Sequence, residues 1–426
     1  MKKFDPYVYL SGLNIDVMRF GLETITELLS RLGNPQNDYK TILIAGTNGK
    51  GSTATMTASI LRSAGYKVGL YTSPHLVDIR ERIVINGRKI ARKDFSQIIA
   101  DIKEKIKKPL TYFEFLTAVA FVYFQRQKVD IAVLEVGLGG RLDATNVCKP
   151  LVSIITNIAF DHMVYLGNAL ESITREKAGI IKQNGICLTA AKQKNVLEVL
   201  KNICAERKAK LYRLGADIKI VKQKKSSFVY QGLYRKLSGL TISLRGEHQL
   251  ANAALAVAAV ELSDKNGLKI DNGAIRAGLK KAYLDARLEV LQKEPLFLLD
   301  GAHNPAGISV LCRALKNNFS YRRLILIFSS LIDKDYRQML KKIAPLAYKI
   351  IITKLKTKRA VSPDNIWEVL EKIGCKAIVT QNVGQAIQKA QALAEKKDLI
   401  CATGSLYLAG EVKQKFPKTV SCAKEY

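Results

Sequence analysis

A glycine-rich segment, GTNGKGS at residues 46–52, carries the groups best suited to bind phosphate. It follows an apolar, β-branched run and precedes a stretch typical of a helix. In that arrangement the backbone N–H groups at the start of the helix, together with its dipole, stabilise an anion. Lys50 adds a positive charge for the β- and γ-phosphates of a nucleotide. The strict Walker pattern is not kept, since Ile44 stands where its first glycine belongs and Gly51 separates the lysine from the serine. We predict a nucleotide phosphate site with an altered loop.

A carboxylate and an imidazole follow two further predicted strands. Glu135 lies near the end of the apolar run DIAVLEV, and Asp161-His162 follows VSIITNIAF. A carboxylate at the end of a strand beside a phosphate loop is a typical Mg²⁺ ligand, because the ion completes its shell with phosphate oxygens and water. The alternative is a glutamate that only ends a strand at a turn. His162 would be a second ligand, although nitrogen is uncommon around Mg²⁺. Lys177, in TREKAGIIK, is by itself typical of a helix surface.

The elements that must position these groups alternate between strand and helix over the first 290 residues. The predicted strands there are 41–46, 68–73, 130–137, 152–158 and 186–190. Short apolar strands separated by helices predict a parallel, doubly wound sheet that binds ligands at the carboxyl ends of its strands. Residues 210–246 differ, because LYRLG, IKIV, FVYQGL and LTISL suggest a small antiparallel insertion. An alanine-rich helix is predicted over 249–262.

The β/α alternation restarts after Pro295. The predicted strands of this part are 296–300, 324–328, 349–353, 377–380 and 399–403. We therefore predict an α/β protein of two domains. Residues 1–293 would form a P-loop-containing, doubly wound ATP-binding domain with the antiparallel insertion, and residues 294–426 a Rossmann-like α/β domain. Ligand sites favour the clefts that such domain pairs make.

Composition narrows the class of protein without deciding it. No apolar run approaches 18 residues, which excludes a transmembrane helix, and seven cysteines without a CxxC pair fit reduced thiols in the cytoplasm. The net charge is +31. It is consistent with a lysine-rich solvated surface, with steering of anionic small molecules, or with nucleic-acid binding. The lysines are dispersed, as near 101–108 and 353–359, so charge alone does not identify the function.

Ten motifs occur in order through essentially the whole chain and together resemble one family. They are Gly46–Ser52 (GTNGKGS), Tyr71–Leu76 (YTSPHL), Thr111–Glu114 (TYFE), Glu135–Asn146 (EVGLGGRLDATN), Asp161-His162, Glu176–Ile180 (EKAGI), Gly246–Asn252 (GEHQLAN), Asp300–Pro305 (DGAHNP), Asp333–Asp335 (DKD) and Gly404–Val412 (GSLYLAGEV). The set resembles folylpolyglutamate synthase/dihydrofolate synthase, which is a member of the Mur-type ATP-dependent amide ligases.

The resemblance implies roles for individual residues. ATP would be bound by Asn48, Gly49, Lys50, Gly51, Ser52, Asn252, Arg287 and Asp300. Mg²⁺ would be held by Ser73, Glu135, His162 and Lys177, the last as a carbamate formed with CO₂. The pterin substrate is expected at Phe113, Leu142, Asp143 and Ala144. Lys50, Lys177 and His303 are the expected catalytic residues.

The implied reaction is ligation of L-glutamate to folates, and also to dihydropteroate, through an acyl phosphate made with ATP. Tyr112 and the segment 141–144 resemble the bifunctional pattern, whereas Met18–Leu22 departs from the form expected of the dihydropteroate loop. We expect a cytoplasmic monomer whose partners are ATP, L-glutamate and folate or dihydropteroate, without a membrane or a specific nucleic acid. The alternatives are another Mur-type amino-acid ligase and a basic nucleic-acid-binding protein. TSPH, TYFE and DGAHNP argue against the first, and the ordered motifs against the second.

Overall fold

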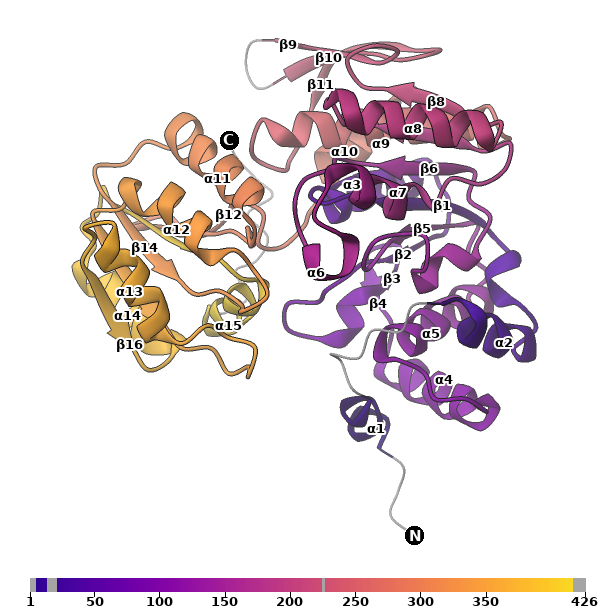
Figure 1. Ribbon diagram of the computed structural model, residues 1–426. Coiled ribbons are helices and arrows are strands. Elements are labelled where there is room, and N and C mark those ends of the chain that lie inside the picture. Colours follow the sequence, from indigo (N-terminus) through magenta and orange to yellow (C-terminus); the bar gives the residue numbers. More distant parts are fainter. Residues whose placement is uncertain (1–4, 14–20, 224–226, 417–426) are drawn as a thin grey trace. The chain divides into compact units, whose positions relative to one another are not determined.

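The computed structural model describes residues 5–13, 21–223 and 227–416, which form two compact units. The first unit comprises Met1–Pro74, Arg80–Ser243 and Gln249–Tyr283, and the second His75–Ile79, Leu244–His248 and Leu284–Tyr426. Both units are α/β, which confirms the predicted fold class (Figure 1). The residue limits of the two predicted domains stay a prediction. No helix among these described ranges is long and apolar enough to cross a membrane.

An eight-stranded sheet forms the centre of the first unit. Its strands, in spatial order, are β4 (Arg88–Lys89), β3 (Ile83–Ile85), β2 (Val68–Tyr71), β5 (Ile131–Glu135), β1 (Lys40–Ala45), β6 (Val152–Ile155), β7 (Ile186–Thr189) and β8 (Lys210–Arg213). The strands from β2 to β8 are parallel, and β3 and β4 extend one edge in antiparallel fashion. β1 and β5 are buried along nearly their whole length, as expected for strands with both faces covered.

Helices surround this sheet. They are α1 (Pro6–Gly12), α2 (Glu23–Arg31), α3 (Lys50–Ser63), α4 (Arg92–Lys105), α5 (Tyr112–Arg126), α6 (Met163–Leu166), α7 (Leu170–Ala178), α8 (Lys194–Glu206), α9 (His248–Asp264) and α10 (Asn272–Lys281), with the 3₁₀ turns Pro35–Asn37, Ile79–Arg82 and Ala144–Val147. α3 and α9 are rich in small residues and almost fully buried. α5 begins at a capping box, because Thr111 Oγ1 accepts from Glu114 N while Glu114 Oε2 accepts from Thr111 N.

The strand order places a topological switch point at β1. From β1 the chain moves to β2 and β5 on one side, and then to β6, β7 and β8 on the other. The carboxyl ends of β1 and β6 therefore border a crevice where open α/β sheets bind ligands. The GTNGKGS segment follows β1 directly and lies at this crevice.

The insertion is smaller than predicted. β9 (Lys219–Lys222), β10 (Ser227–Gln231) and β11 (Lys236–Thr241) form a separate antiparallel sheet, seen at the top of Figure 1. The LYRLG stretch was predicted to belong to it, but it forms β8, which pairs parallel to β7 in the main sheet. The helix α8 that precedes LYRLG supplies the crossover that a parallel pair needs.

A second sheet, of six strands, forms the centre of the second unit. Its order is β12 (Glu289–Gln292), β13 (Leu296–Leu299), β17 (Leu399–Thr403), β14 (Leu324–Phe328), β15 (Lys349–Thr353) and β16 (Ala377–Thr380), with only β12 antiparallel. The helices are α11 (Pro305–Asn318), α12 (Tyr336–Ile343), α13 (Pro363–Lys372), α14 (Val383–Leu393) and α15 (Leu406–Lys415), with one 3₁₀ turn, Ala344–Leu346. Each of these α-helices starts at an Asn, Asp or Ser whose side chain accepts a backbone N–H.

Candidate active site

The glycine-rich loop is held in place by the residues that follow β6. Thr47 N donates to Asn157 O at 2.9 Å, and Asn48 N donates to Asn157 Oδ1 at 2.8 Å. Thr156 Oγ1 donates to Asn48 O at 2.7 Å, and the Thr47 hydroxyl bonds both the N–H and the C=O of Ala159. The loop is thus fixed before any ligand binds. These residues were not predicted from the sequence, although the polar pair Thr156-Asn157 after an apolar strand was a usable signal.

Two positions in the loop accept only glycine. Gly46 has φ +139°, and a Cβ there would lie 1.9 Å from Thr156 Oγ1. Gly49 has φ +84° at the N-cap of α3, and its Cβ would lie 2.4 Å from Asn252 Oδ1. Positive φ is costly for residues with a side chain, and the available space is already occupied. The loop therefore turns tightly and presents the first-turn N–H groups of α3.

Lys50, Ser52 and Asn252, which were all assigned to ATP above, lie around this loop in the structure. Lys50 Nζ donates to Gly46 O at 3.1 Å and to Thr47 O at 3.3 Å, so its ammonium group lies against the loop. Gln249 Nε2 donates to Ser52 Oγ at 3.3 Å, and Asn252 Nδ2 donates to Gln249 Oε1 at 2.9 Å. The start of α9 thereby lies beside the start of α3.

Glu135, Ser73 and Lys177 lie at the same edge of the sheet as the loop. Glu135 is the last residue of β5 and pairs with Ile44 of β1. Its Oε2 accepts from Ser73 N at 3.1 Å, and the residue is 5 % exposed. Lys177 is also 5 % exposed, and its Nζ donates to Gly46 O at 3.2 Å. The default interpretation of Lys177 as a helix-surface lysine is therefore wrong, because the side chain is buried against the phosphate loop.

Contacts between two sequence motifs hold the end of α7, where Lys177 lies. Arg141 N donates to Glu176 O at 2.7 Å, and the Arg141 guanidinium pairs with the Glu176 carboxylate at 2.9 Å. A Cβ on Gly179 would lie 2.3 Å from Arg141 Cα. Arg207 Nη1 adds bonds to the carbonyl groups of Ala178 and Gly179. The EKAGI and GRLDATN motifs are therefore packed and hydrogen-bonded to each other. Because Lys177 lies within EKAGI, these contacts fix its position.

His162 starts α6 in a left-handed conformation, with φ +52°. Its N–H donates to Asp161 Oδ1 at 2.9 Å. Such backbone outliers are costly and are concentrated at functional sites. In the part of the chain that the structure describes, no group of three His, Cys, Asp or Glu residues is close enough to hold a metal ion by itself. A divalent ion held by Glu135 and the Ser73 hydroxyl would take substrate oxygens and water in its remaining positions. That donor set fits Mg²⁺, which keeps water and phosphate oxygens as ligands.

The residues predicted to bind the pterin surround the loop after β5. The Phe113 ring packs on Gly137, where a Cβ would lie 2.6 Å from the ring, and it lies 5.9 Å from the Tyr71 ring centroid. Asp143 Oδ2 accepts from the N–H groups of Gly137 and Leu138, each at 3.0 Å. Burial raises the pKa of Asp143, and the bonds it accepts oppose that rise. Asp143 thus shapes the loop against which Phe113 packs. Its neighbour Leu142 is partly exposed and Ala144 is buried.

The second unit places three predicted site residues around the turn after β13. Asp300 accepts from Leu288 N and Ala302 N, both at 2.9 Å, and is buried. Burial raises the pKa of Asp300, and the positive charge of Arg287 opposes the rise. A Cβ on Gly301 would lie 2.7 Å from Arg287 Nη1, which places the guanidinium against the turn. His303 Nδ1 lies 2.8 Å from Gly301 O.

Three hydroxyl groups at the carboxyl ends of β14 and β15 were not predicted. Ser329, Ser330 and Thr353 are each fully buried, and their hydroxyl oxygens have no hydrogen-bond partner among the described residues. Buried polar groups are normally paired, and Gln36, Thr41, Thr53 and Glu114 of the first unit also carry unpaired side-chain atoms among the described residues. The strand ends themselves were predictable. The unpaired state of the hydroxyls was not, because it depends on packing between strands distant in sequence.

His248, in the GEHQLAN motif, is held neutral near Arg287 and Arg313. Burial, with the charges of these two arginines, lowers the pKa of His248 to about 4 from an ordinary value of 6.5. His248 takes up a proton more readily in the unfolded chain than in the folded one, because its pKa is lower in the folded state. The unfolding free energy is therefore highest above pH 6.5 and falls as the pH drops toward 4. We expect the wild type to lose of order 2 kcal/mol of unfolding free energy across that window relative to His248→Gln. Urea melts of both proteins from pH 7 to 4 measure the difference, and parallel curves would contradict it.

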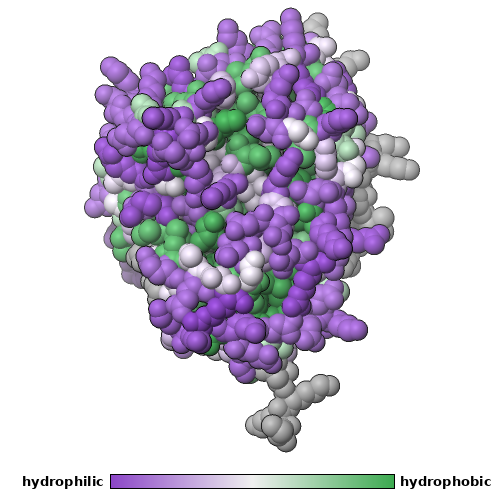
Figure 2. All heavy atoms as spheres, turned by 90° about the vertical axis from the view of Figure 1, so that its right-hand side faces the viewer, coloured by the Kyte–Doolittle hydropathy of each residue, from purple (hydrophilic) through white to green (hydrophobic). Residues whose placement is uncertain are grey.

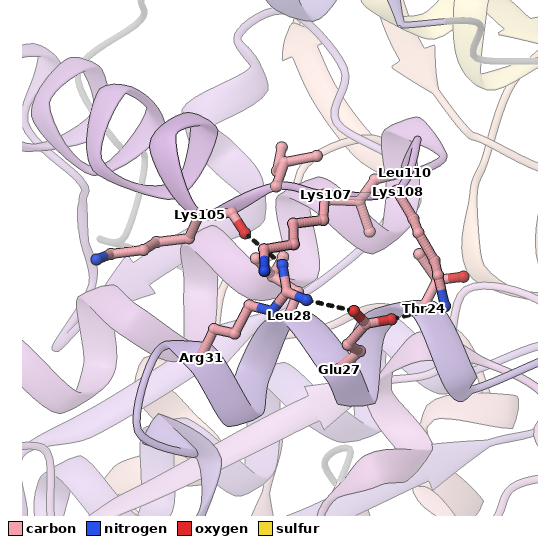
Figure 3. Close-up of a pocket in the computed structure, with 9 residues that line it drawn as sticks. Thr24, Glu27, Leu28, Arg31, Lys105, Lys107, Lys108 and Leu110 are labelled. Atoms are coloured by element: carbon pink, nitrogen blue, oxygen red, sulfur yellow. Dashed lines mark hydrogen bonds and ion pairs between the residues drawn. The ribbon is translucent and has the colours of Figure 1, made fainter.

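A shallow pocket between α2 and the α4–α5 connection is unrelated to this site. Glu27 pairs with Arg31 at 2.5 Å and with Lys108 at 2.8 Å, and Arg31 also donates to Lys105 O. Figure 3 shows these side chains at the lining of the pocket. The bond from Lys108 is the main cause of the lowered pKa of Glu27. The Glu27 carboxylate thus neutralises part of the positive charge of Arg31 and Lys108. On the face seen in Figure 2, hydrophilic side chains predominate and apolar groups form scattered patches.

Comparison with known protein families divides the chain into two matched regions. Residues 44–260 match the Mur ligase middle domain, and residues 286–406 match the Mur ligase glutamate ligase domain. The chain is 35% identical over 410 residues to the dihydrofolate synthase/folylpolyglutamate synthase of Bacillus subtilis (strain 168), covering 93% of this chain and 94% of that protein.

Solved structures show the same similarity. The structure of Escherichia coli FolC in complex with DHPP and ADP aligns with a TM-score of 0.89 at 31% identity, covering 96% of both chains. A bifunctional folylpolyglutamate synthase/dihydrofolate synthase with Mn, AMPPNP and L-glutamate bound aligns with a TM-score of 0.87 at 33% identity, again over 96% of both chains.

Proposed function

This chain belongs to the Mur ligase family, with the dihydrofolate synthase/folylpolyglutamate synthases, and on that premise we propose that it is an ATP-dependent ligase that adds L-glutamate to folates and to dihydropteroate. The observation that carries the proposal is the convergence at the carboxyl edge of the first sheet. There the buried Lys177 donates to Gly46 O of the fixed phosphate loop, and Glu135 pairs with Ile44 of β1, two residues before Gly46. A plain nucleotide-binding fold needs the loop and a metal ligand, but it has no need of a buried lysine beside them.

The reaction has two stages, because a free carboxylate is a poor electrophile. ATP first phosphorylates the pterin substrate's carboxylate, giving an acyl phosphate and ADP. The α-amine of L-glutamate then attacks the acyl carbon, phosphate leaves, and an amide bond forms. Lys50 stabilises charge on the transferring phosphoryl group, while the loop and the first turn of α3 orient the phosphates. No side-chain nucleophile is needed.

The enzyme works with ATP and a divalent metal ion, and we assign Mg²⁺ to Ser73, Glu135 and His162. When bound, the ion supplies positive charge to the phosphate oxygens. We assign nucleotide binding to Asn48, Gly49, Gly51, Ser52 and Asn252 of the first unit. Arg287 and Asp300 of the second unit are assigned to ATP, and His303 to catalysis, from the family resemblance.

Lys177 is the fourth metal ligand in this proposal, as a carbamate. Its neutral amine attacks CO₂, the N–C bond forms, and the amine proton is lost to solvent. The cation thereby becomes an anionic pair of oxygens, which suits a hard metal. The burial of Lys177 beside the phosphate loop supports this change, because a fixed ammonium group there would oppose a metal ion.

The pterin would lie against Phe113, with Leu142, Asp143 and Ala144 shaping its pocket. Activity on dihydropteroate is supported by the 141–144 segment and by the bifunctional relatives. Residues 18–20 of the divergent MRFGL segment lie outside the described residues. We further assign the protein to the cytoplasm, as a monomer. The comparisons favour this ligase over a nucleic-acid-binding protein, and the ligase acts on polyanions that its positive surface charge attracts.

An ADP-release assay tests the function directly. The purified chain is supplied with ATP, Mg²⁺ and L-glutamate, and with either tetrahydrofolate or dihydropteroate. We expect turnover with both acceptors, and mass spectrometry should show products heavier by one or more glutamyl residues. Turnover with tetrahydrofolate but not with dihydropteroate would show that the chain lacks dihydrofolate synthase activity. The absence of turnover with any pterin acceptor would instead favour another amino-acid ligase of the Mur type.

A further inference from the structure

Arg287 lies between two residues in the left-handed backbone conformation. Ala286 has φ +53° and Leu288 has φ +47°. Residues other than glycine adopt this conformation only when surrounding contacts hold them in it. The direction of the Arg287 side chain therefore depends on the bonds that maintain this turn.

Three bonds hold the turn. Gly301 N donates to Ala286 O at 2.8 Å, and Leu288 N donates to Asp300 Oδ2 at 2.9 Å. These two come from the DGAHNP segment, which is already part of the site. The third bond is from Ala286 N to Glu289 Oε2, at 2.9 Å, and Glu289 has no place in the proposed chemistry.

The Glu289 carboxylate is itself held by Lys413, in the last turn of α15. Lys413 Nζ pairs with Glu289 Oε1 and, at 2.7 Å, with Asp285 Oδ1. The Glu289 and Lys413 side chains are only 10% and 25% exposed. Burial disfavours the charge on Lys413, but the bonds to the two carboxylates outweigh it and raise the pKa of Lys413. The lysine therefore stays charged at neutral pH and links α15 to both sides of the turn.

We propose that Glu289 and Lys413 are positioning residues for Arg287, which they hold in the orientation that binds the nucleotide. The inference rests on the proposed contact between Arg287 and ATP. It also gives a role to α15, which contains most of the GSLYLAGEV motif. Leu406, the first residue of this helix, lies next to Gly301, and Lys413 lies in its last turn. Neither Glu289 nor Lys413 touches the reacting atoms in this proposal.

The test is ADP binding by calorimetry, together with steady-state kinetics, for Glu289→Ala, Lys413→Met and Arg287→Ala. We expect Glu289→Ala to raise the Kd for ADP and the KM for ATP about tenfold, the scale of one charge-linked hydrogen bond. The kcat at saturating ATP should change less than about threefold. The lost interaction would bind the nucleotide equally in the ground state and in the transition state, so its loss affects KM and not kcat. Lys413→Arg should stay close to wild type. Glu289→Gln keeps an acceptor for Ala286 N and provides a milder variant if Glu289→Ala is unstable.

Two controls separate positioning from general stability. Lys396→Met breaks the exposed pair between Lys396 and Glu294 in the same unit, and should leave ADP binding unchanged. In the Arg287→Ala background, Glu289→Ala should weaken ADP binding no further. A full additional tenfold loss there, or a Kd within twofold of wild type for Glu289→Ala alone, would overturn the proposal. ADP binding needs neither pterin nor glutamate, so this result stands apart from the identity of the acceptor. Unchanged ADP binding by Arg287→Ala would reject the inference and leave the ligase function intact.

Discussion

Replacing Lys177 with alanine is expected to abolish glutamate ligation, with kcat lower by about 10³-fold, the scale of losing one group that acts on transferring phosphoryl charge. The Lys177 side chain is buried at the phosphate loop and its Nζ donates to Gly46 O, so a side chain at the protein surface could not replace it. The fold should survive, because Lys50 Nζ also donates to Gly46 O. We expect a stability loss of only about 1 kcal/mol, that of one ordinary hydrogen bond. The ADP-release assay and a thermal melt measure the two quantities separately.

The matched control for this variant is Arg175→Ala, which removes an exposed cation from the same helix. It should keep wild-type kcat. The carbamate itself is tested by ¹³C NMR of the wild type under ¹³CO₂, where a carbamate resonance should appear and should be missing in Lys177→Ala. Near-normal kcat in Lys177→Ala would remove the carbamate from the mechanism. Loss of activity without a carbamate resonance would leave Lys177 acting as an unmodified cation at the loop.

The central elements of the fold were accessible from the sequence because their signals are local. Apolar β-branched runs identified every parallel strand next to the site, and the N-cap residues of α11 to α15 mark where those helices begin. The antiparallel edge strands β3 and β4 were missed, since they are short and one of them is fully exposed. The LYRLG stretch was assigned to the wrong sheet, because its residues suit a strand in either one. Only the crossover helix α8 decides between them.

The sequence names the residues of the proposed site but not the contacts that hold them. The glycine-rich loop, Glu135 and Lys177 were recognised from residue type and motif. The bonds that hold them come from Thr156, Asn157 and other residues whose types are common in loops. Such partners are defined only when β1 and β6 lie side by side, which depends on long-range pairing. The same reason hid the Glu289–Lys413 pair, whose members are 124 residues apart in sequence.

In the proposed mechanism, the altered loop has a physical consequence for catalysis. Gly51 follows Lys50 immediately, and Lys50 is the first residue of α3. Its ammonium group therefore lies where the helix dipole already favours anions, and the two effects add at the phosphate. The bonds from Lys50 Nζ to the carbonyls of Gly46 and Thr47 keep the side chain folded over the loop. The Lys50 side chain thus loses little conformational entropy when ATP binds. We therefore expect it to stabilise the transition state more than it strengthens the binding of ATP.

Lys50→Met is accordingly expected to lower kcat for ligation by about 10³-fold while raising the Kd for ATP only about tenfold. Methionine keeps the length of the side chain but removes its charge, so a loss confined to binding would place Lys50 outside the transition state. Lys40→Met is the matched control, because Lys40 is the first residue of β1, at the end of that strand opposite the loop, and its Nζ donates to a backbone carbonyl, Asn266 O. It should keep wild-type kcat. Lys50→Arg keeps the charge but changes its shape, and should recover part of the activity if charge is what acts. A kcat for Lys50→Met within tenfold of wild type would show that the first turn of α3 and the metal ion suffice to stabilise the transferring phosphoryl group.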